Sequence, residues 1–375
     1  MKTLYKLILV LSVVLFVSCE EQLTELNVNP QGVDPETVNP NLLLTTVITN
    51  TASPYLNDGF DGGSAGVMQY IQFSGWGSSR NKYDWVGEAG WGGTFGNLRN
   101  IQHMYDRSVE EGMEFHQGVA LVLRAFNFAY IADWWGDAPY TEALKGSEGE
   151  QENLFPVFDT QETIYRGIIE ELKTANTLLS KSVGEYKGIN ADADVIYGGD
   201  PEKWRKMANS LMLRYYMRVS SKLSDYAKTG IEEIIDNSLT YPIFASNDDD
   251  ATMGYPGTSG DDAWPNAIAF DATESDFNRV QLCAGFRDVL IERNDPRIDV
   301  WFDKAVIPIK VSTAQSPAAD IIVDGIRYIH PDSMAIRNWV VYNKDTWPAD
   351  IEAGKVLVDT NDFPGMPIAS STGDG

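Results

Sequence analysis

Residues 114–135 constrain the possible fold more than any other part of the sequence. Apolar side chains recur at helical spacing on two faces of this segment. One face carries Phe115, Val119, Val122, Phe126 and Tyr130, and another carries Leu121, Ala125, Phe128, Ala132 and Trp135. Because a helix that is apolar on two faces must be covered on both, the sequence predicts a buried helix within a larger helical body.

Other segments predict helices that could cover it. The clearest start is Asp200 followed by Pro201, an N-cap and a first-turn proline, and Asn39-Pro40 gives a similar start to a helix through Ile48. Further helical patterns cover residues 97–109, 160–179, 230–237 and 275–293. Strand-like runs are few, at 304–312 and 325–329, so we expect a mainly α architecture.

The N-terminus is typical of an exported lipoprotein. Lys2 and Lys6 precede an apolar run over 7–17, which is shorter than the roughly twenty residues that a membrane-spanning helix needs. Val17-Ser18-Cys19 matches a lipobox, so we expect residues 1–18 to be removed and Cys19 to carry lipid, with an ordinary signal peptide as the alternative. Residues 19–39 are expected to form a flexible tether and residues 40–375 one helical domain.

The charge balance limits the possible partners. The chain has 54 acidic and 29 basic residues, a net charge of −25, which disfavours a nucleic-acid partner. Loss of Lys2 and Lys6 would leave 27 basic residues and a net charge of −27, so lipid rather than electrostatics should hold the protein at a membrane. If Cys19 is acylated, Cys283 has no disulfide partner, and its apolar surroundings predict a buried cysteine.

Catalytic and metal-binding signatures are weak. The sequence has no His-Glu-x-x-His motif, no Walker A loop and no zinc-spaced Cys/His cluster. Residues 247–250 (Asn-Asp-Asp-Asp) could ligate calcium but lack EF-hand spacing, so a solvated acidic loop is the better interpretation. We expect no catalytic residue, cofactor or metal, although a glycoside hydrolase needs only two carboxylates and stays open as an alternative.

Residues 59–96 form an unusual segment that holds 11 of the 32 glycines. The same segment contains Trp76, Tyr83 and Trp85. Glycine weakens regular structure, whereas aromatic rings offer large and stiff contact surfaces. The combination predicts a shaped surface loop.

Several motifs, in order along the chain, resemble the SusD/RagB family of outer-membrane nutrient-binding lipoproteins. After the lipobox come Leu-Asn-Val-Asn-Pro at 26–30, Val-Asn-Pro-Asn-Leu-Leu at 38–43, and Arg-Ala-Phe at 124–126 leading to Trp-Trp-Gly-Asp-Ala-Pro-Tyr at 134–140. Tyr-Gly-Gly-Asp at 197–200, the helix after it and Asn-Asp-Pro-Arg at 294–297 continue the series. The family usually continues into a further C-terminal helical segment, so we expect this chain to be incomplete there.

The resemblance implies an α-helical fold with tetratricopeptide-like helix pairs and large irregular insertions that hold the ligand. It also implies an oligosaccharide or peptide ligand, a lipid-anchored position at the outer membrane facing the exterior, and a TonB-dependent transporter that the protein covers as a lid. No catalysis is implied. A surface glycoside hydrolase with a helical body and a purely structural helical-repeat adaptor are the alternatives.

The candidate ligand residues lie in the glycine-rich insertion and in a later loop of similar kind. They are Trp76, Tyr83, Trp85 and Trp264, whose rings could stack on sugars, with Asn81 and Asp84 to bond hydroxyl groups. In contrast, the motif at 134–140 and Trp91 are expected to belong to the scaffold and core.

Overall fold

The computed structural model describes residues 37–56, 64–73, 90–259, 263, 280–312, 320–329, 356–358 and 362. These residues fall into two compact units, and each is described by itself. The helical unit takes in the chain up to Val47, Arg99–Ala132 and Gly136–Asp249. The second unit takes in Ile48–Leu98, Asp133–Trp135 and the chain from Asp250 onward.

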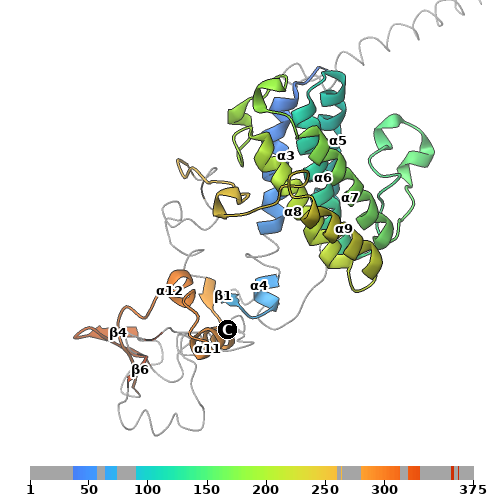
Figure 1. The fold of residues 1–375 in the computed structure, drawn as a ribbon. Coiled ribbons are helices and arrows are strands. Elements are labelled where there is room, and N and C mark those ends of the chain that lie inside the picture. The colour runs from blue at the N-terminus through green and yellow to red at the C-terminus, as the bar shows by residue number, and fades with distance from the viewer. Residues whose placement is uncertain are drawn as a thin grey trace, which may run out of the picture. The chain divides into compact units, whose positions relative to one another are not determined.

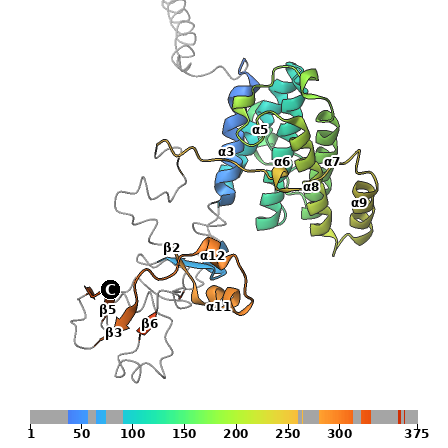
Figure 2. The same cartoon turned by 60° about the vertical axis from the view of Figure 1, so that its left-hand side comes forward.

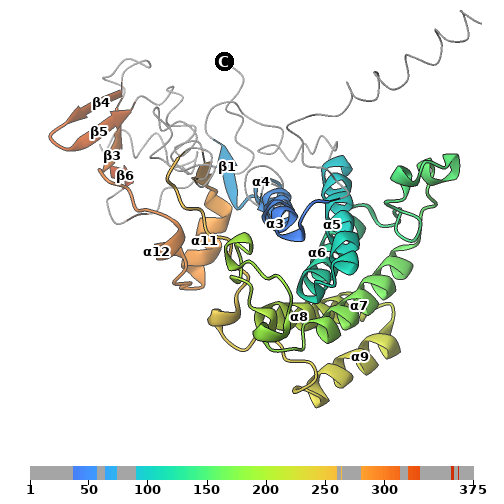
Figure 3. The same ribbon diagram turned by 90° about the horizontal axis from the view of Figure 1, so that it is seen from above.

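The helical unit is built from consecutive helices around α6 (Glu114–Trp135, of which the part up to Ala132 belongs here), which has the predicted bounds. The others are α3 (Pro40–Leu56, whose first turns belong here), α5 (Gly92–Glu110, from Arg99 on), α7 (Gln161–Leu178), α8 (Pro201–Val219) and α9 (Ser224–Asp236). Figure 3 shows α5 beside α6, then α7 with α8, and α9 outermost, and Figure 2 also places α9 at the edge. Most of α6 is buried, as its two apolar faces predict.

Side-chain caps fix three of the helix starts. Asn39 Oδ1 accepts a hydrogen bond from the Asn41 N–H at 2.9 Å, before α3. The Thr160 side chain accepts from the Thr163 N–H at the start of α7. The Asp200 carboxylate accepts from the backbone of residues 202 and 203 at the start of α8. Each cap satisfies amide groups that have no partner within the helix, and the predicted starts are confirmed.

Two helices begin earlier than their patterns predict. α5 starts at Gly92 rather than 97 because the Trp91 carbonyl accepts from the Phe95 N–H at 3.0 Å and the two rings pack 5.5 Å apart. α9 starts at Ser224 rather than 230, where the Tyr226 ring lies 5.2 Å from that of Tyr216 on α8. In both cases aromatic packing outweighs a poor local helix signal.

The second unit contains a short two-stranded sheet. β1 (Ile71–Phe73) pairs antiparallel with β2 (Val280–Leu282), with Ile71 opposite Leu282. The helix predicted over 275–293 is therefore wrong at 280–282, because pairing with a strand two hundred residues earlier leaves no local signal. The helix there, α11, covers only Ala284–Glu292.

The second unit also holds a four-stranded sheet in the order β4-β5-β3-β6. Its strands are β3 (Ile309–Val311), β4 (Asp320–Val323), β5 (Ile326–Ile329) and β6 (Val356–Val358), so the strand-like runs at 304–312 and 325–329 are confirmed in part. β5 is parallel to β3, whereas the β4–β5 and β3–β6 pairs are antiparallel. Short helices α4 (Ser64–Val67) and α12 (Ile298–Trp301) complete the unit.

Helices dominate the described residues, as the sequence predicts, and Figure 1 shows where they lie along the chain. Among those residues, none of the helices combines the length and apolar character needed to cross a bilayer.

Candidate functional site

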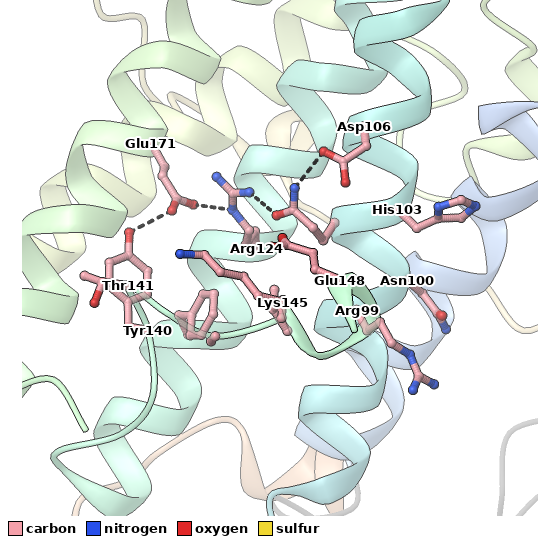
Figure 4. Close-up of a pocket in the computed structure, with 14 residues that line it drawn as sticks. Arg99, Asn100, His103, Asp106, Arg124, Tyr140, Thr141, Lys145, Glu148 and Glu171 are labelled. Carbon is pink, nitrogen blue, oxygen red and sulfur yellow. Dashed lines mark hydrogen bonds and ion pairs between the residues drawn. The ribbon is translucent and has the colours of Figure 1, made fainter. Parts of the chain in front are cut away.

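The helical unit contains a pocket of about 920 Å³ between α5, α6, α7 and the loop that follows α6 (Figure 4). Its walls are formed by Arg99, Asn100, Gln102, His103, Asp106, Arg124, Phe128, Tyr140, Thr141, Ala143, Leu144, Lys145, Glu148 and Glu171. Such a volume suits a small polar ligand, and the lining determines what it could hold.

A chain of hydrogen bonds crosses the pocket and joins three helices to the loop (Figure 4). Arg124 Nε donates to Glu171 Oε2 at 2.9 Å, and the Tyr140 hydroxyl donates to Glu171 Oε1 at 2.7 Å. Arg124 Nη1 also donates to Gln102 Oε1, and Gln102 Nε2 donates to Asp106 Oδ1 at 2.8 Å. The central polar groups thus bond mainly to one another, so the network braces the loop against the helices.

The electrostatics of this network favour a fixed brace over acid–base chemistry. Burial raises the pKa of Tyr140 far above its usual value, and the neighbouring Glu171 carboxylate raises it further, so the hydroxyl remains a donor at physiological pH. Both Glu171 oxygens accept hydrogen bonds, and one pairs with Arg124, whose side chain is only 17% exposed. Both carboxylate oxygens of Glu171 are therefore engaged within the brace.

The pocket rim carries groups that the central network does not use. Arg99 on α5 and Lys145 on the loop make no ion pair with another described residue, and Asn100 lies beside Arg99. The lining contains three cationic residues, Arg99, Arg124 and Lys145, and three acidic residues, Asp106, Glu148 and Glu171. This local balance, in a chain of net charge −25, suits a neutral polar ligand better than a polyanion.

The loop after α6 forms a projecting segment, residues 138–159, which we call the arm. Ala138 and Asp159 exchange two backbone hydrogen bonds, at 3.0 and 3.1 Å, and so close its base. The Asp159 carboxylate also accepts from the Thr141 N–H at 2.7 Å. The arm includes two short 3₁₀ turns, η3 (Gly146–Glu148) and η4 (Gln151–Leu154), and extends from the helical unit as the green lobe in Figures 1 and 3.

The motif at 134–140 has a structural role at each of several positions. Gly136 ends α6 at a φ of 78°, with its N–H donating to the Ala132 carbonyl. Asp137 Oδ1 accepts from the backbone N–H of Gln161, the first residue of α7, at 2.9 Å. Tyr140 belongs to the network just described. These contacts explain the motif as the frame that holds the arm.

A second structural centre lies at Asp194, which sequence reasoning missed. Its carboxylate is almost fully buried and accepts from the Trp204 indole N–H at 2.7 Å and from the Gly199 N–H at 2.9 Å. Gly199 has a φ of 80°, and a Cβ there would lie 2.6 Å from Ile189 Cγ2. An acidic residue a few positions before a Gly-Gly turn and a tryptophan is the signal that could have revealed this centre.

The residues predicted to bind ligand, and the predicted lipid-attachment residue Cys19, lie outside the described residues. The predicted ligand residues are Trp76, Asn81, Tyr83, Asp84, Trp85 and Trp264. The sequence did not indicate the pocket residues either, since Gln102, Arg124 and Glu171 come from three separate helices and share no motif.

Two other expectations can be compared with the described residues. Cys283 is fully buried, as predicted, and burial raises the pKa of its thiol. The prediction of a solvated acidic loop at 247–250 is wrong for Asp249, which is buried and pairs with Lys206 Nζ at 2.9 Å. Within the described part of the chain, no three His, Cys, Asp or Glu side chains cluster as metal ligands would.

Comparison with known proteins gives a family match over most of the chain. Residues 33–313 match the family model SusD-like_2, described as "Starch-binding associating with outer membrane". None of the curated proteins matches the chain.

Solved structures give a consistent result. A SusD homologue from Bacteroides fragilis is 25% identical, with a TM-score of 0.58, over 72% of this chain and 54% of its own. A SusD/RagB family protein from Bacteroides thetaiotaomicron is 26% identical, with a TM-score of 0.54, over 70% and 53%. A chitin-binding SusD homologue from Flavobacterium johnsoniae is 19% identical, with a TM-score of 0.55, over 70% and 55%, and this likeness concerns the fold alone. The chain spans about half the length of these proteins.

Proposed function

Because the chain belongs to the SusD-like family, whose mainly helical fold its structure shares, we propose that it captures glycans at the cell surface. The family match over residues 33–313 is the observation that carries the proposal. In this proposal the protein binds an oligosaccharide without catalysis and passes it to an outer-membrane transporter.

The proposed ligand is a neutral oligosaccharide. Trp76, Tyr83, Trp85 and Trp264 would stack on the apolar faces of sugar rings, with Asn81 and Asp84 bonding hydroxyl groups. The description of the matching family, "Starch-binding associating with outer membrane", supports a carbohydrate ligand over a peptide. The excess of acidic residues also disfavours sulfated or uronic-acid glycans.

Binding without catalysis fits the pocket chemistry. Its central carboxylate, the half-buried Glu171, is engaged by Arg124 and Tyr140, whereas a glycoside hydrolase needs two carboxyl groups free to act at one glycosidic bond. The proposed partner is a TonB-dependent transporter, which the protein would cover as a lid. Acylation of Cys19 would hold it at the outer membrane, facing the exterior.

Calorimetry with oligosaccharides tests the proposal and locates the site. Trp76→Ala, Tyr83→Ala, Trp85→Ala and Trp264→Ala should each remove a stacking contact of about 1–3 kcal/mol, a loss of roughly fivefold to more than a hundredfold in affinity. A matched pocket variant, Arg99→Ala with Lys145→Ala, should bind like the parent if the aromatic residues hold the ligand. Circular dichroism controls for folding.

The results separate the competing interpretations. Loss of binding only in the pocket variant would move the site to the pocket between α5, α6 and α7. Release of reducing sugar by the parent would replace the binding function with hydrolysis. Mass spectrometry that finds Cys19 unmodified in the mature protein would contradict the lipid anchor.

A further inference from the structure

The arm exposes an unusual run of large apolar side chains. Four of the five residues from 154 to 158 are large and apolar, and their exposed fractions are 61% for Leu154, 76% for Phe155, 52% for Val157 and 61% for Phe158. Single exposed apolar residues are common on soluble proteins, whereas consecutive ones mark contact sites.

The arm that carries this run has a defined conformation. The Ala138–Asp159 bridge closes its base, and the Val157 N–H donates to Glu142 Oε2 at 3.3 Å near the apolar residues. Leu144 has a φ of 69°, a left-handed conformation that costs a non-glycine residue about 1 kcal/mol or more. The half-buried network through Tyr140 anchors the same segment to α7. A segment held in this way presents its apolar residues with little loss of conformational entropy on binding.

Charge on the arm indicates what kind of surface it fits. Residues 138–159 contain five acidic residues and one basic residue, Lys145. Glu148 and Glu150 are both exposed close to the apolar run. An anionic membrane surface would repel such a segment, whereas a protein surface with an apolar centre and a basic rim would complement it.

We propose that Leu154, Phe155, Val157 and Phe158 form a docking surface for a protein partner that presents an apolar socket rimmed by Lys or Arg. The inference rests on the proposed function, under which this partner is the outer-membrane transporter. The arm is the contact, and the pocket network beneath it sets its position. The residues proposed to bind glycan lie elsewhere in the sequence, so replacing this surface should leave glycan affinity unchanged.

Binding to the transporter tests the docking surface directly. The proposed partner, a TonB-dependent transporter, is tagged. Its affinity for the full chain is compared with its affinity for a Leu154→Ser, Phe155→Ser, Val157→Ser variant. A Val183→Ser, Leu239→Ser variant is the matched control, since these side chains are 60% and 95% exposed elsewhere on the helical unit. We expect at least a tenfold loss for the arm variant and less than a twofold change for the control.

The two proposals fail in different ways. Equal transporter affinity for the arm variant and the parent overturns the docking surface, as does a parent that does not bind the transporter. Glycan calorimetry on both proteins reports the capture function separately. Arm-dependent binding to phosphatidylethanolamine–phosphatidylglycerol vesicles, or an arm-dependent dimer of this chain with transporter binding intact, also overturns the proposal in favour of another surface. Melting temperatures should be equal, because the replaced side chains are exposed.

Discussion

At the scale of single residues, His116 is the clearest case of a polar group fixed by burial. Its ring is fully buried on α6, and Nε2 lies 2.9 Å from Asn41 Oδ1 on α3. Burial lowers the pKa of His116 to about 4, although the nearby Asp194 carboxylate acts in the opposite direction. The imidazole is therefore neutral in the folded protein at neutral pH.

This burial predicts a loss of stability in mild acid. Because the folded-state pKa lies below the ordinary value of 6.5, the folded state binds a proton less readily than the unfolded state. The contribution of the neutral His116 to the free energy of unfolding is complete above pH 6.5. It falls as the pH drops towards 4, by up to about 3 kcal/mol. Urea unfolding from pH 7.5 to 4.5 should show a shallower decline for His116→Gln than for the parent. If the stability of the parent and of His116→Gln falls equally with pH, the burial of His116 does not cause the loss.

The burial of a residue could be predicted from the sequence where its neighbours in the chain determine it. Where a partner distant in the sequence determines it, the burial could not be predicted. Cys283 could be predicted because apolar residues surround it in the chain. The burial of Asp249 could not, because its partner Lys206 lies on α8, more than forty residues earlier. The same limitation hid the pocket network, since Arg124 and Glu171 are 47 positions apart.

At the scale of elements, close contacts between helices depend on particular glycines. Gly230 on α9 faces the ring of Tyr216 on α8, and a Cβ there would lie 2.1 Å from Tyr216 Cζ. Gly96 lies within α5, and a Cβ there would meet nothing within 4 Å. The two glycines share a helical backbone but differ in the space around them.

The pair predicts opposite effects of one substitution. Gly96→Ala should stabilise the protein by about 0.5–1 kcal/mol through helix propensity. Gly230→Ala gains the same helix-propensity stabilisation, but the new methyl group forces the buried Tyr216 ring aside, at a cost of about 1–3 kcal/mol. Its net effect on the free energy of unfolding should therefore be destabilising or at best neutral. Thermal unfolding of both variants measures the difference, and a stabilised Gly230→Ala would show that α8 and α9 separate easily.

Helix starts with side-chain caps were predictable from sequence because a cap and its amide partners are adjacent in the chain. Asp200 before Pro201 is the clearest example, and α8 begins there. β2 was not predictable, because its hydrogen-bond partners on β1 lie about two hundred residues earlier. The early start of α5 depends on Trp91 packing against Phe95, which a helix-propensity argument at Gly92 and Gly93 does not include.

At the scale of the whole molecule, the strong negative charge makes ionic strength a probe of the ligand. Neutral sugars bound by stacking and hydroxyl contacts make little use of long-range charge. Affinity for a neutral oligosaccharide should therefore change by less than about twofold between 20 and 500 mM NaCl, as measured by calorimetry. A steep weakening with salt would indicate a charged ligand held by cations such as Arg80 and Lys82, two basic residues of the glycine-rich segment 59–96.

The bridge at the base of the arm also bears on how the fold can diversify. Because Ala138 and Asp159 are paired, the ends of α6 and α7 need the same short connection whatever lies beyond them. The loop between these two positions can become longer or shorter, or have its residues exchanged, without altering the distance between the ends of the two helices. The arm is thus a modular insertion point at which the same helical frame can acquire new surface specificity, and a natural position for grafting a foreign loop.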